Sequence, residues 1–301
     1  MDIAITGSSG LIGSALTRSL TDDGHRVVPI VRSAAPGAVT WDIEAGTIDA
    51  GGLEGLDAVV HLAGEPIAGG PWTSAQRARI RDSRSHGTHL LAEALAGLQR
   101  PPSVLVSGSA IGYYGDGGDQ PLPESAPPGD DFLAGVCRAW EAAAEPAASA
   151  GIRVATIRTG IVLDPSGGAL AKQLPIFKLG LGGKAGRGDQ WMPWITLDDE
   201  VRAIRFAIDT DDLAGPVNLV APNPVTNAAF TEALGEALGR PTFLRIPRLA
   251  THAPLGVGDL VGSLLFTSAR VVPEALLAAG FEFGDPELGP ALDRLVGRPS
   301  R

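Results

Sequence analysis

The feature that most constrains this chain is a glycine turn directly after its first apolar strand. Residues 4–13 read AITGSSGLIG and space Gly7, Gly10 and Gly13 three residues apart. The first glycine permits a sharp turn, the second lets a phosphate approach bare backbone, and the third lets the next helix pack tightly on the sheet. The N-terminus of that helix attracts anions. The pattern therefore predicts a dinucleotide-binding turn, whereas a Walker-type phosphate loop is excluded because no GK[ST] follows.

Composition narrows the class of protein. The chain has 301 residues, and 44% of them are hydrophobic, which suffices for one large domain or a main domain with a smaller lobe. A formal net charge of −10 disfavours nucleic acid and anionic membranes as partners. The lone Cys137 indicates a reducing compartment. With neither a signal peptide nor an apolar membrane span in sequence, we expect a cytoplasmic protein that binds a small molecule.

Short apolar strands alternate with helical stretches through the first half of the chain. This alternation is typical of a parallel sheet covered by helices on both faces, so the predicted fold class is α/β, a doubly wound sheet of the Rossmann type. The Gly-, Pro- and Asp-rich segment 115–130 is predicted to be an exposed loop. The expected strands cover residues 3–5, 26–31, 39–41, 57–64, 103–107 and 152–160, and the expected helices cover 11–22, 74–98 and 131–150.

The alternation stops after Gly160. We place an NADP-binding Rossmann domain at 1–165 and a smaller C-terminal substrate lobe at 166–301. The apolar helical stretches around 201–208 and 230–238 are assigned to that lobe. The segment GPVNLVA, which begins at Gly215, is the best candidate for a late strand that returns to the sheet.

The residue at the end of the second strand usually discriminates between dinucleotides. A carboxylate there would bind the ribose 2′-OH and repel a 2′-phosphate, but this chain has Arg32 followed by Ser33. A guanidinium binds phosphate in a bidentate manner and stacks on adenine. We therefore expect NADP(H) rather than NAD(H), with a solvated loop arginine as the alternative. Asp42 in the third strand is a further candidate contact to the adenine.

Several motifs together resemble the extended short-chain dehydrogenase/reductase superfamily. GSSGLIG matches its cofactor loop, HLAG (61–64) its fourth-strand turn, and VSGSAIGYYG (106–115) its fifth-strand serine segment. RTGIV (158–162) is similar to the segment that closes over nicotinamide. On the long helix, Arg84 stands where the superfamily often has Asn three residues before Gly-Thr. The cofactor residues assigned from the glycine turn, the second and third strands and these motifs are Gly7, Ser8, Ser9, Gly10, Leu11, Ile12, Gly13, Arg32, Ser33, Asp42, Leu62, Ala63, Gly64, Glu65, Arg84, Ser107, Gly160 and Val162.

Three further motifs narrow the resemblance. The WE pair (140–141), GRGDQWMPWITLDDE (186–200) and RVVPEALLAAGFEF (270–283) are similar to atypical epimerase-family proteins with their own C-terminal domain, placed here from about residue 245. The resemblance implies an NADP(H)-binding oxidoreductase or epimerase-like enzyme. It also implies a homodimer through helices on the flank of the sheet.

The proton-transfer pair of the superfamily is missing. Its members use a tyrosine and a lysine four residues later, because the lysine lowers the phenol pKa and holds the ribose. The two tyrosines of this chain, Tyr113 and Tyr114, have no lysine at that spacing. In the segment DFLAGVCRAWE the matching positions hold Phe132 and Val136 or Leu133 and Cys137, depending on the alignment.

Three hypotheses remain for the chemistry. Tyr113 or Tyr114 could act with Ser109, which matches the catalytic serine of the superfamily, although a loop clasp is a competing role for the tyrosines. Glu65 or Cys137 could serve instead. In the third hypothesis the protein binds NADP(H) without rapid turnover and acts as a sensor or regulatory module.

The substrate region also departs from the superfamily. Nucleotide-sugar enzymes commonly have a diphosphate-binding arginine two residues before the aromatic residue aligned with Trp194, where this chain has Met192. Lys184 or a neighbouring side chain could compensate, but the tryptophans suggest an apolar wall or plain core packing. We therefore disfavour nucleotide sugars as substrates. His86 and His89 lack further ligands at metal-binding spacing, so no metal is expected. The candidate substrate residues are Arg187, Gln190, Trp191 and Met192.

Overall fold

Eight strands form the central sheet, in the order β13-β8-β6-β5-β1-β2-β3-β4, in a computed structural model that describes residues 1–248 and 257–297. Neighbouring strands are parallel except for the pair β3 and β4, which is antiparallel. The order reverses direction at β1, which places the glycine turn at the switch point of the sheet. The strands are β1 (Asp2–Thr6), β2 (Arg26–Val31), β3 (Val39–Asp42), β4 (Thr47–Ile48), β5 (Ala58–His61), β6 (Val104–Ala110), β8 (Arg153–Thr159) and β13 (Gly215–Leu219).

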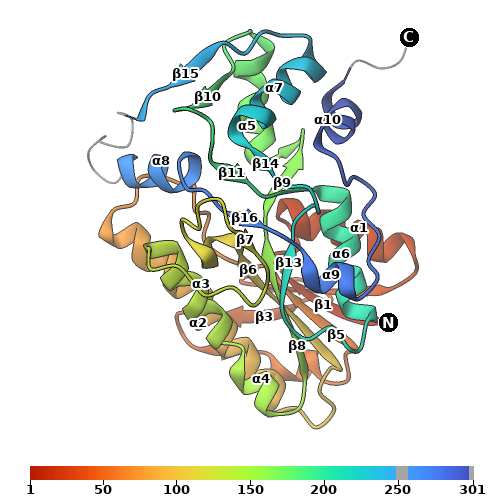
Figure 1. The fold of residues 1–301 in the computed structure, drawn as a ribbon. Coiled ribbons are helices and arrows are strands. Elements are labelled where there is room, and N and C mark those ends of the chain that lie inside the picture. The colour runs from red at the N-terminus through yellow and green to blue at the C-terminus, as the bar shows by residue number, and fades with distance from the viewer. Residues whose placement is uncertain (249–256, 298–301) are drawn as a thin grey trace.

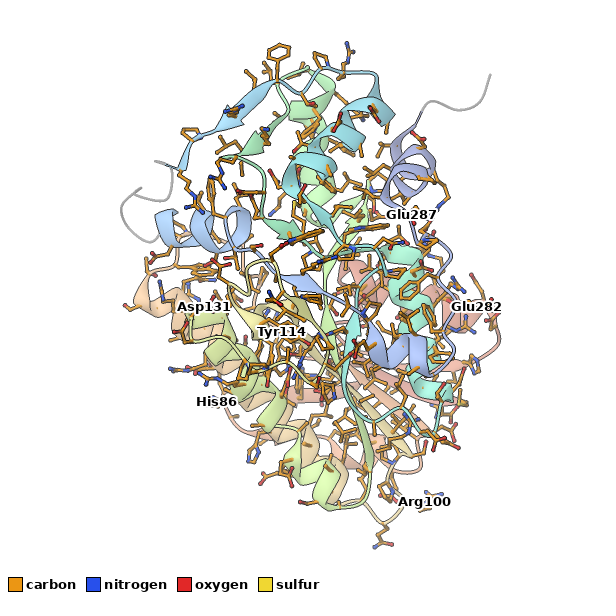
Figure 2. The ribbon with its side chains drawn as sticks, viewed as in Figure 1. His86, Arg100, Tyr114, Asp131, Glu282 and Glu287 are labelled. Carbon is orange, nitrogen blue, oxygen red and sulfur yellow. The ribbon has the colours of Figure 1, made fainter. Side chains whose placement is uncertain are left out.

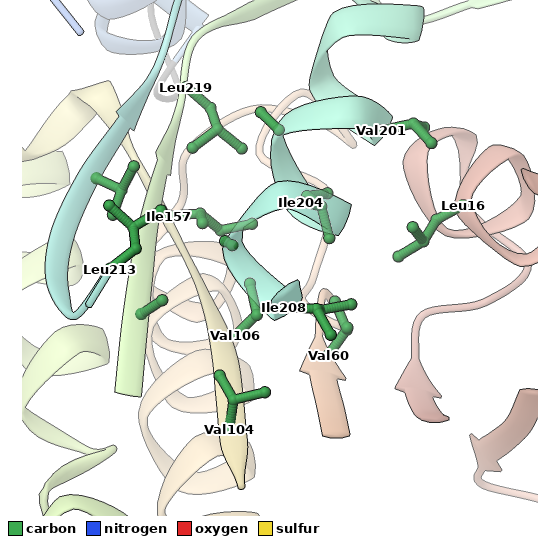
Figure 3. Close-up of a cluster of buried hydrophobic side chains, with 14 of the residues drawn as sticks. Leu16, Val60, Val104, Val106, Ile157, Val201, Ile204, Ile208, Leu213 and Leu219 are labelled. Atoms are coloured by element: carbon green, nitrogen blue, oxygen red, sulfur yellow. The ribbon is translucent and has the colours of Figure 1, made fainter. Parts of the chain in front are cut away.

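Helices cover both faces of the sheet (Figure 1). Alternate residues of a strand point to opposite faces. Ile3 and Ile5 accordingly pack with α1 (Leu11–Asp22) and α6 (Leu197–Asp209), as Figure 3 shows for the labelled residues of this cluster. Ala4 points to the opposite face of the sheet. It packs there in a second hydrophobic cluster, which includes side chains of the helices that cover that face. The doubly wound α/β fold is thereby confirmed. The second layer consists of α2 (Ser74–Ala96), α3 (Phe132–Ala142) and α4 (Glu145–Ser149).

In the second half of the chain, one predicted element is present as expected and another lies in a different part of the fold. The late strand predicted from GPVNLVA is present as β13, which pairs in parallel with β8. The apolar stretch 201–208, assigned above to the lobe, instead lies in α6 and buries Ile204 against the sheet. The periodicity of a sequence indicates that a helix has an apolar face, but it does not indicate which part of the fold packs against that face. The assignment of 201–208 to the lobe failed for this reason.

The smaller lobe lies beyond the carboxyl ends of the sheet strands (Figure 1). Its own core is built around Trp194 and Phe230, which are almost fully buried. Three two-stranded pairings hold it together: β9 with β12, β11 with β14, and β10 with β15. Its elements are β9 (Ile161–Asp164), α5 (Gly168–Lys178), β10 (Gly183–Ala185), β11 (Trp191–Met192), β12 (Trp194–Thr196), β14 (Val225–Thr226), α7 (Asn227–Leu238), β15 (Leu244–Ile246), α8 (Val257–Leu265) and α10 (Leu288–Val296).

The segment 115–130 is more ordered than an exposed loop. It contains β7 (Pro121–Leu122), which pairs with β16 (Arg270–Val271) in the C-terminal segment. Leu122 is buried in this pairing. The prediction of an exposed loop holds for most of the segment, but it missed this pairing because the partner strand lies about 150 residues away, where local composition carries no signal. After β16, the short helix α9 (Glu274–Ala278) returns to the sheet.

The predicted helix 131–150 is divided into α3 and α4, with Pro146 in the first turn of α4, where proline is tolerated. Two short 3₁₀ helices, η1 (Ala50–Leu53) and η2 (Ile111–Tyr114), complete the elements that frame the site. Within residues 1–248 and 257–297, no helix combines the length and the apolarity needed to cross a bilayer.

Candidate functional site

The glycine turn between β1 and α1 is too tight for side chains. Gly7 has a φ of +67°, in the left-handed region that favours glycine. A Cβ on Gly13 would lie 2.2 Å from the carbonyl oxygen of Gly7. Gly10 precedes α1 with extended backbone, and no side chain caps the helix. The first-turn amides of α1 thus face outward without an intrahelical acceptor, and this arrangement fits the pyrophosphate of a dinucleotide.

A buried hydrogen-bond network holds the end of β5 against this turn. The Thr6 hydroxyl oxygen accepts hydrogen bonds from the amides of Leu62 (3.0 Å) and Ala63 (3.1 Å). The hydroxyl hydrogen of Thr6 can then be donated to Nδ1 of His61, which lies 2.8 Å from the hydroxyl oxygen. Burial lowers the pKa of His61 to about 4, so the ring is neutral at physiological pH. Leu62 and Ala63 therefore lie beside Gly7, as the resemblance implies for a cofactor-binding turn.

Arg84 crosses from α2 to the same turn. Its guanidinium stacks over the Trp140 ring at 4.9 Å, and its Nη1 donates to the carbonyl oxygens of Glu65 (2.9 Å) and Ile80 (3.1 Å). A Cβ on Gly64 would lie only 3.1 Å from the guanidinium carbon. Burial lowers the pKa of Arg84. The structure thus brings together Gly64, Glu65 and Arg84.

The predicted discriminator of the cofactor follows β2. Arg32 and Ser33 are exposed, and β2 lies beside β1 in parallel, so both residues are near the edge that carries the glycine turn. Arg32 has no protein partner among the described residues. The Asp42 carboxylate accepts hydrogen bonds from the amides of Glu44 and Ala45, both at 3.0 Å, and so forms a local turn at the end of β3.

Three more of the predicted cofactor residues lie on β6, directly after β8, and on β9. Ser107 is buried on β6, and its hydroxyl has no hydrogen-bond partner among the described residues. Gly160 follows β8, and a Cβ there would lie 2.8 Å from Cγ1 of Val220. Val162 is partly buried and pairs with Ile195 of β12.

Ser109, at the end of β6, is anchored by a buried ion pair. Its hydroxyl donates to Oε1 of Glu141 at 2.7 Å. Arg158 of β8 binds the same carboxylate with Nε (2.8 Å) and Nη2 (2.9 Å). Burial opposes the charged form of Arg158, but Glu141 and the Tyr114 hydroxyl raise the pKa of the guanidinium above its ordinary value. The serine oxygen is therefore fixed in place with lone pairs left to accept a hydrogen bond.

The two tyrosines clasp Arg158 rather than face the cavity described below. The Tyr114 hydroxyl accepts from Nη1 of Arg158 (2.9 Å) and donates to Oδ1 of Asn218 (2.7 Å), deep inside the molecule (Figure 2). Burial raises the pKa of Tyr114 to about 12. The Tyr113 ring lies 3.5 Å from the guanidinium carbon of Arg158. Their predicted catalytic role therefore has no support from position, and the competing loop-clasp role describes their contacts.

A cavity of about 720 Å³ opens between the sheet edge and the lobe. Ser109, Arg84 and Gly160 lie on its sheet side. Both alignments for the missing dyad place residues on the cavity wall, since Leu133 and Cys137 of one alignment and Val136 of the other line it. Phe132, by contrast, packs against Trp72 with ring centroids 5.3 Å apart.

The Cys137 thiol is a poor proton-transfer group. Burial raises its pKa to about 12, and its Sγ lies 3.6 Å from the carbonyl oxygen of Ala110. Glu65, the other candidate for this task, is not among the cavity-lining residues, and its carboxylate accepts a hydrogen bond from Gln76.

The lobe supplies the opposite wall of the cavity. Trp191, Met192 and Gln190 line it. The Gln190 amide donates to the carbonyl oxygen of Leu265 at 2.6 Å, which ties β11 to α8. Arg187 does not line the cavity, because its side chain is 88% exposed and pairs with Asp189. Its predicted contact with substrate has no support from this position.

Two carboxylates near the cavity, one partly buried and one fully buried, had no role in the predictions. Glu141 was noted only as half of the WE motif, since nothing in a sequence indicates that it reaches across to β6. Glu200 of α6 is fully buried and accepts a hydrogen bond from the Thr159 hydroxyl at 2.8 Å. Burial raises the pKa of Glu200 to about 8. Its position in the acidic run DDE resembled an ordinary helix start.

Comparison with known sequences agrees with this architecture. The profile of the NAD-dependent epimerase/dehydratase family matches residues 3–220, and that of a domain of unknown function, DUF1731, matches 247–295. Epimerase family protein Mb2239 of Mycobacterium bovis is 44% identical over 299 residues, covering 99% of this chain and 98% of that protein. Human epimerase family protein SDR39U1 is 37% identical over 300 residues, covering 98% and 100%.

Solved structures give the same result. Human SDR39U1 (isoform 2), crystallised with NADPH, has a TM-score of 0.90 at 35% identity and covers 98% of this chain and 99% of that chain. A nucleoside-diphosphate sugar epimerase from Corynebacterium glutamicum has a TM-score of 0.81 at 39% identity, over 99% of this chain and 58% of that chain. The resemblance read from the motifs is confirmed, and the chain belongs to the NAD-dependent epimerase/dehydratase family, with the DUF1731 domain at its C-terminal end.

Proposed function

We propose that the protein is an NADP(H)-dependent oxidoreductase or epimerase-like enzyme that acts on a small carbonyl or hydroxyl compound. The observation that carries this proposal is the shared position of the glycine turn, Arg84 and Ser109 at one edge of the parallel sheet, beside a cavity of about 720 Å³. Ligands of open α/β sheets bind at this edge, at the switch point. The NADPH in the crystal structure of human SDR39U1 supports the choice of cofactor.

The residues present fit NADP(H). The first-turn amides of α1 would bind the pyrophosphate, and Arg32 would bind the 2′-phosphate and stack on the adenine. Arg84 would contact the ribose next to nicotinamide, since it lies near Cys137, which is the position of the missing lysine in one of the two alignments. When bound, the cofactor supplies or accepts a hydride at its nicotinamide ring.

Ser109 and Glu141 are the proposed proton-transfer groups. Because the serine hydrogen is donated to Glu141, the serine oxygen can accept the proton of a substrate hydroxyl while its own proton moves to the carboxylate. Arg158 keeps that carboxylate oriented through two hydrogen bonds. In the direction of carbonyl reduction the same two protons move back.

The second candidate is a dinucleotide-binding sensor that turns its cofactor over slowly or not at all. It is favoured by one observation: at the positions of the usual dyad, the cavity wall holds Leu133 and Cys137 in one alignment and Val136 in the other. None of these side chains can act as an acid or base near neutral pH.

Fluorescence titrations with NADPH and NADH test the cofactor assignment. We expect NADPH to bind more tightly, and Arg32→Ala to weaken NADPH much more than NADH and so remove that preference. An unchanged preference would contradict the role of Arg32. Absorbance of the reduced nicotinamide, followed with a panel of carbonyl compounds, then separates the two candidates. Tight NADPH binding without turnover of any compound favours the sensor.

Ser109→Ala tests the proposed chemistry. It should lower kcat about a hundredfold or more while the Kd for NADPH changes little, because the serine hydroxyl acts on substrate rather than on cofactor. Equal losses in kcat and cofactor affinity would contradict a catalytic role.

We further propose a homodimer through the helices on the flank of the sheet and a cytoplasmic location. Sedimentation velocity of the purified protein tests the first, with a single species of twice the chain mass as the expected result. Fractionation of cells that express the tagged protein tests the second.

A further inference from the structure

Exposed apolar side chains gather at one place on the lobe. Of the eight large hydrophobic residues that are exposed in the described parts of the chain, six lie on α5, the loop after it, and the segment around β15. The exposed fractions of these six range from 38% to 77%. We call this set the apolar rim: Ile176, Leu179, Leu181, Phe243, Leu244 and Ile246.

The apolar rim is continuous with the cavity. Four of its members, Ile176, Leu181, Leu244 and Ile246, also line the cavity. The pairing of β10 with β15, from Gly183 opposite Leu244 onward, holds the two parts of this wall together at the far end of the lobe (Figure 1). An apolar surface therefore extends from the floor at Ser109 to the outside of the molecule.

Charged groups are sparse along this path. Among the described residues that line the cavity, only Arg84, Asp131 and Arg245 carry charged side chains. Asp131 caps α3 through the amide of Ala134 (2.8 Å), and Arg84 binds the Glu65 carbonyl oxygen. A nucleotide diphosphate would require several cations and polar groups, and the rim provides one exposed arginine between two aliphatic side chains.

We propose that the cavity binds a carbonyl or hydroxyl compound that bears a long apolar chain, with the polar end at Ser109 and the chain extending across the apolar rim. This inference rests on the proposed function, because it names the substrate class of the same site. Apolar area that is exposed to water lowers the solubility of a protein. An apolar chain of the substrate, bound across the rim, covers that area. The volume of the cavity suits a ligand of this size.

Calorimetric titration with straight-chain methyl ketones, from butanone to undecanone, tests the proposal in the absence and presence of NADP⁺. Burial of each methylene should tighten binding about fourfold until the chain passes the rim. Leu244→Ser should weaken undecanone about tenfold and leave butanone unchanged. Leu277→Ser is the matched control, because Leu277 is a half-exposed leucine on α9, away from the cavity.

The outcomes separate this proposal from the proposed function. A flat chain-length series, or equal effects of the two leucine variants, overturns the apolar-chain substrate even if NADPH binds well. Ketone binding without NADPH binding overturns the proposed function instead. A third outcome is a flat series in a protein that dimerises or binds phosphatidylcholine vesicles, where Leu244→Ser abolishes the dimer or the vesicle binding. It would show that protein or lipid covers the rim, and it also overturns the proposal.

Discussion

The two walls of the cavity are built in different ways. On the sheet side, beside the cavity, backbone packs against backbone at the glycine turn, where a Cβ at Gly13 would meet a carbonyl oxygen at 2.2 Å. The ion pair between Glu141 and Arg158 lies behind the sheet wall and anchors Ser109, which lines the cavity. The lobe wall is made by aliphatic side chains that are partly exposed, on α5, the loop after it and the short strand β15. A wall of the first kind recognises a fixed chemical group, whereas one of the second kind recognises only size and apolarity. This difference predicts that substitutions on the sheet wall have large effects and those on the rim small ones.

Removal of the buried carboxylate should give the largest effect. Glu141→Ala leaves Arg158, whose side chain is 3% exposed, without its ion-pair partner. We expect the free energy of unfolding to fall by about 3–5 kcal/mol, the typical cost of a buried charge left alone. Urea unfolding measures this change. Asp189→Ala is the control, because it removes the partner of an exposed arginine and should cost less than about 1 kcal/mol. Similar losses in both variants would contradict the contrast.

A methyl group in the glycine turn should abolish tight cofactor binding. In Gly13→Ala the added Cβ forces the Gly7 carbonyl away by more than an ångström. Such a displacement should weaken NADPH about a hundredfold. Gly289→Ala is matched to it, since Gly289 also lies in the first turn of a helix but has open space around it. Equal NADPH affinities in the two variants, each with a normal thermal melt, would refute the proposed pyrophosphate site.

Glu200 makes stability depend on pH. Its pKa is raised from 4.5 to about 8 in the folded protein. Its contribution to stability is therefore full below about pH 4.5 and is lost as the pH rises through about 8. Glu200→Gln should gain in Tm relative to the native protein over this range. A difference in Tm between Glu200→Gln and the native protein that stays constant from pH 4.5 to about 8 would show that Glu200 titrates normally.

The rim should be the most tolerant region. Leu179 is 74% exposed and does not line the cavity. Leu179→Ser should change the free energy of unfolding by no more than about 0.5 kcal/mol. A loss of several kcal/mol, measured by urea unfolding, would mean that the rim supports the fold rather than a ligand.

The same contrast explains what the sequence could predict. The glycine turn, the alternating strands and β13 follow from local rules of backbone conformation and periodicity, and the fold class with its cofactor edge could be inferred from them. The packing of α6 against the sheet could not be inferred, because an apolar helix face does not indicate which surface it packs against. Nor could the pairing of β7 with β16, the reach of Glu141 to Ser109, or the clasp of the tyrosines on Arg158, since each joins distant segments whose meeting depends on the whole fold.

The most direct test of the account is a crossed binding experiment on Gly13→Ala and Leu244→Ser. NADPH and undecanone are titrated separately into each variant, with thermal melts as a check on folding. We expect Gly13→Ala to weaken NADPH about a hundredfold and to keep the native affinity for undecanone. We expect Leu244→Ser to weaken undecanone about tenfold and to keep the native affinity for NADPH. If either folded variant loses both ligands, or neither, the division of the cavity into a cofactor wall and an apolar substrate wall is contradicted.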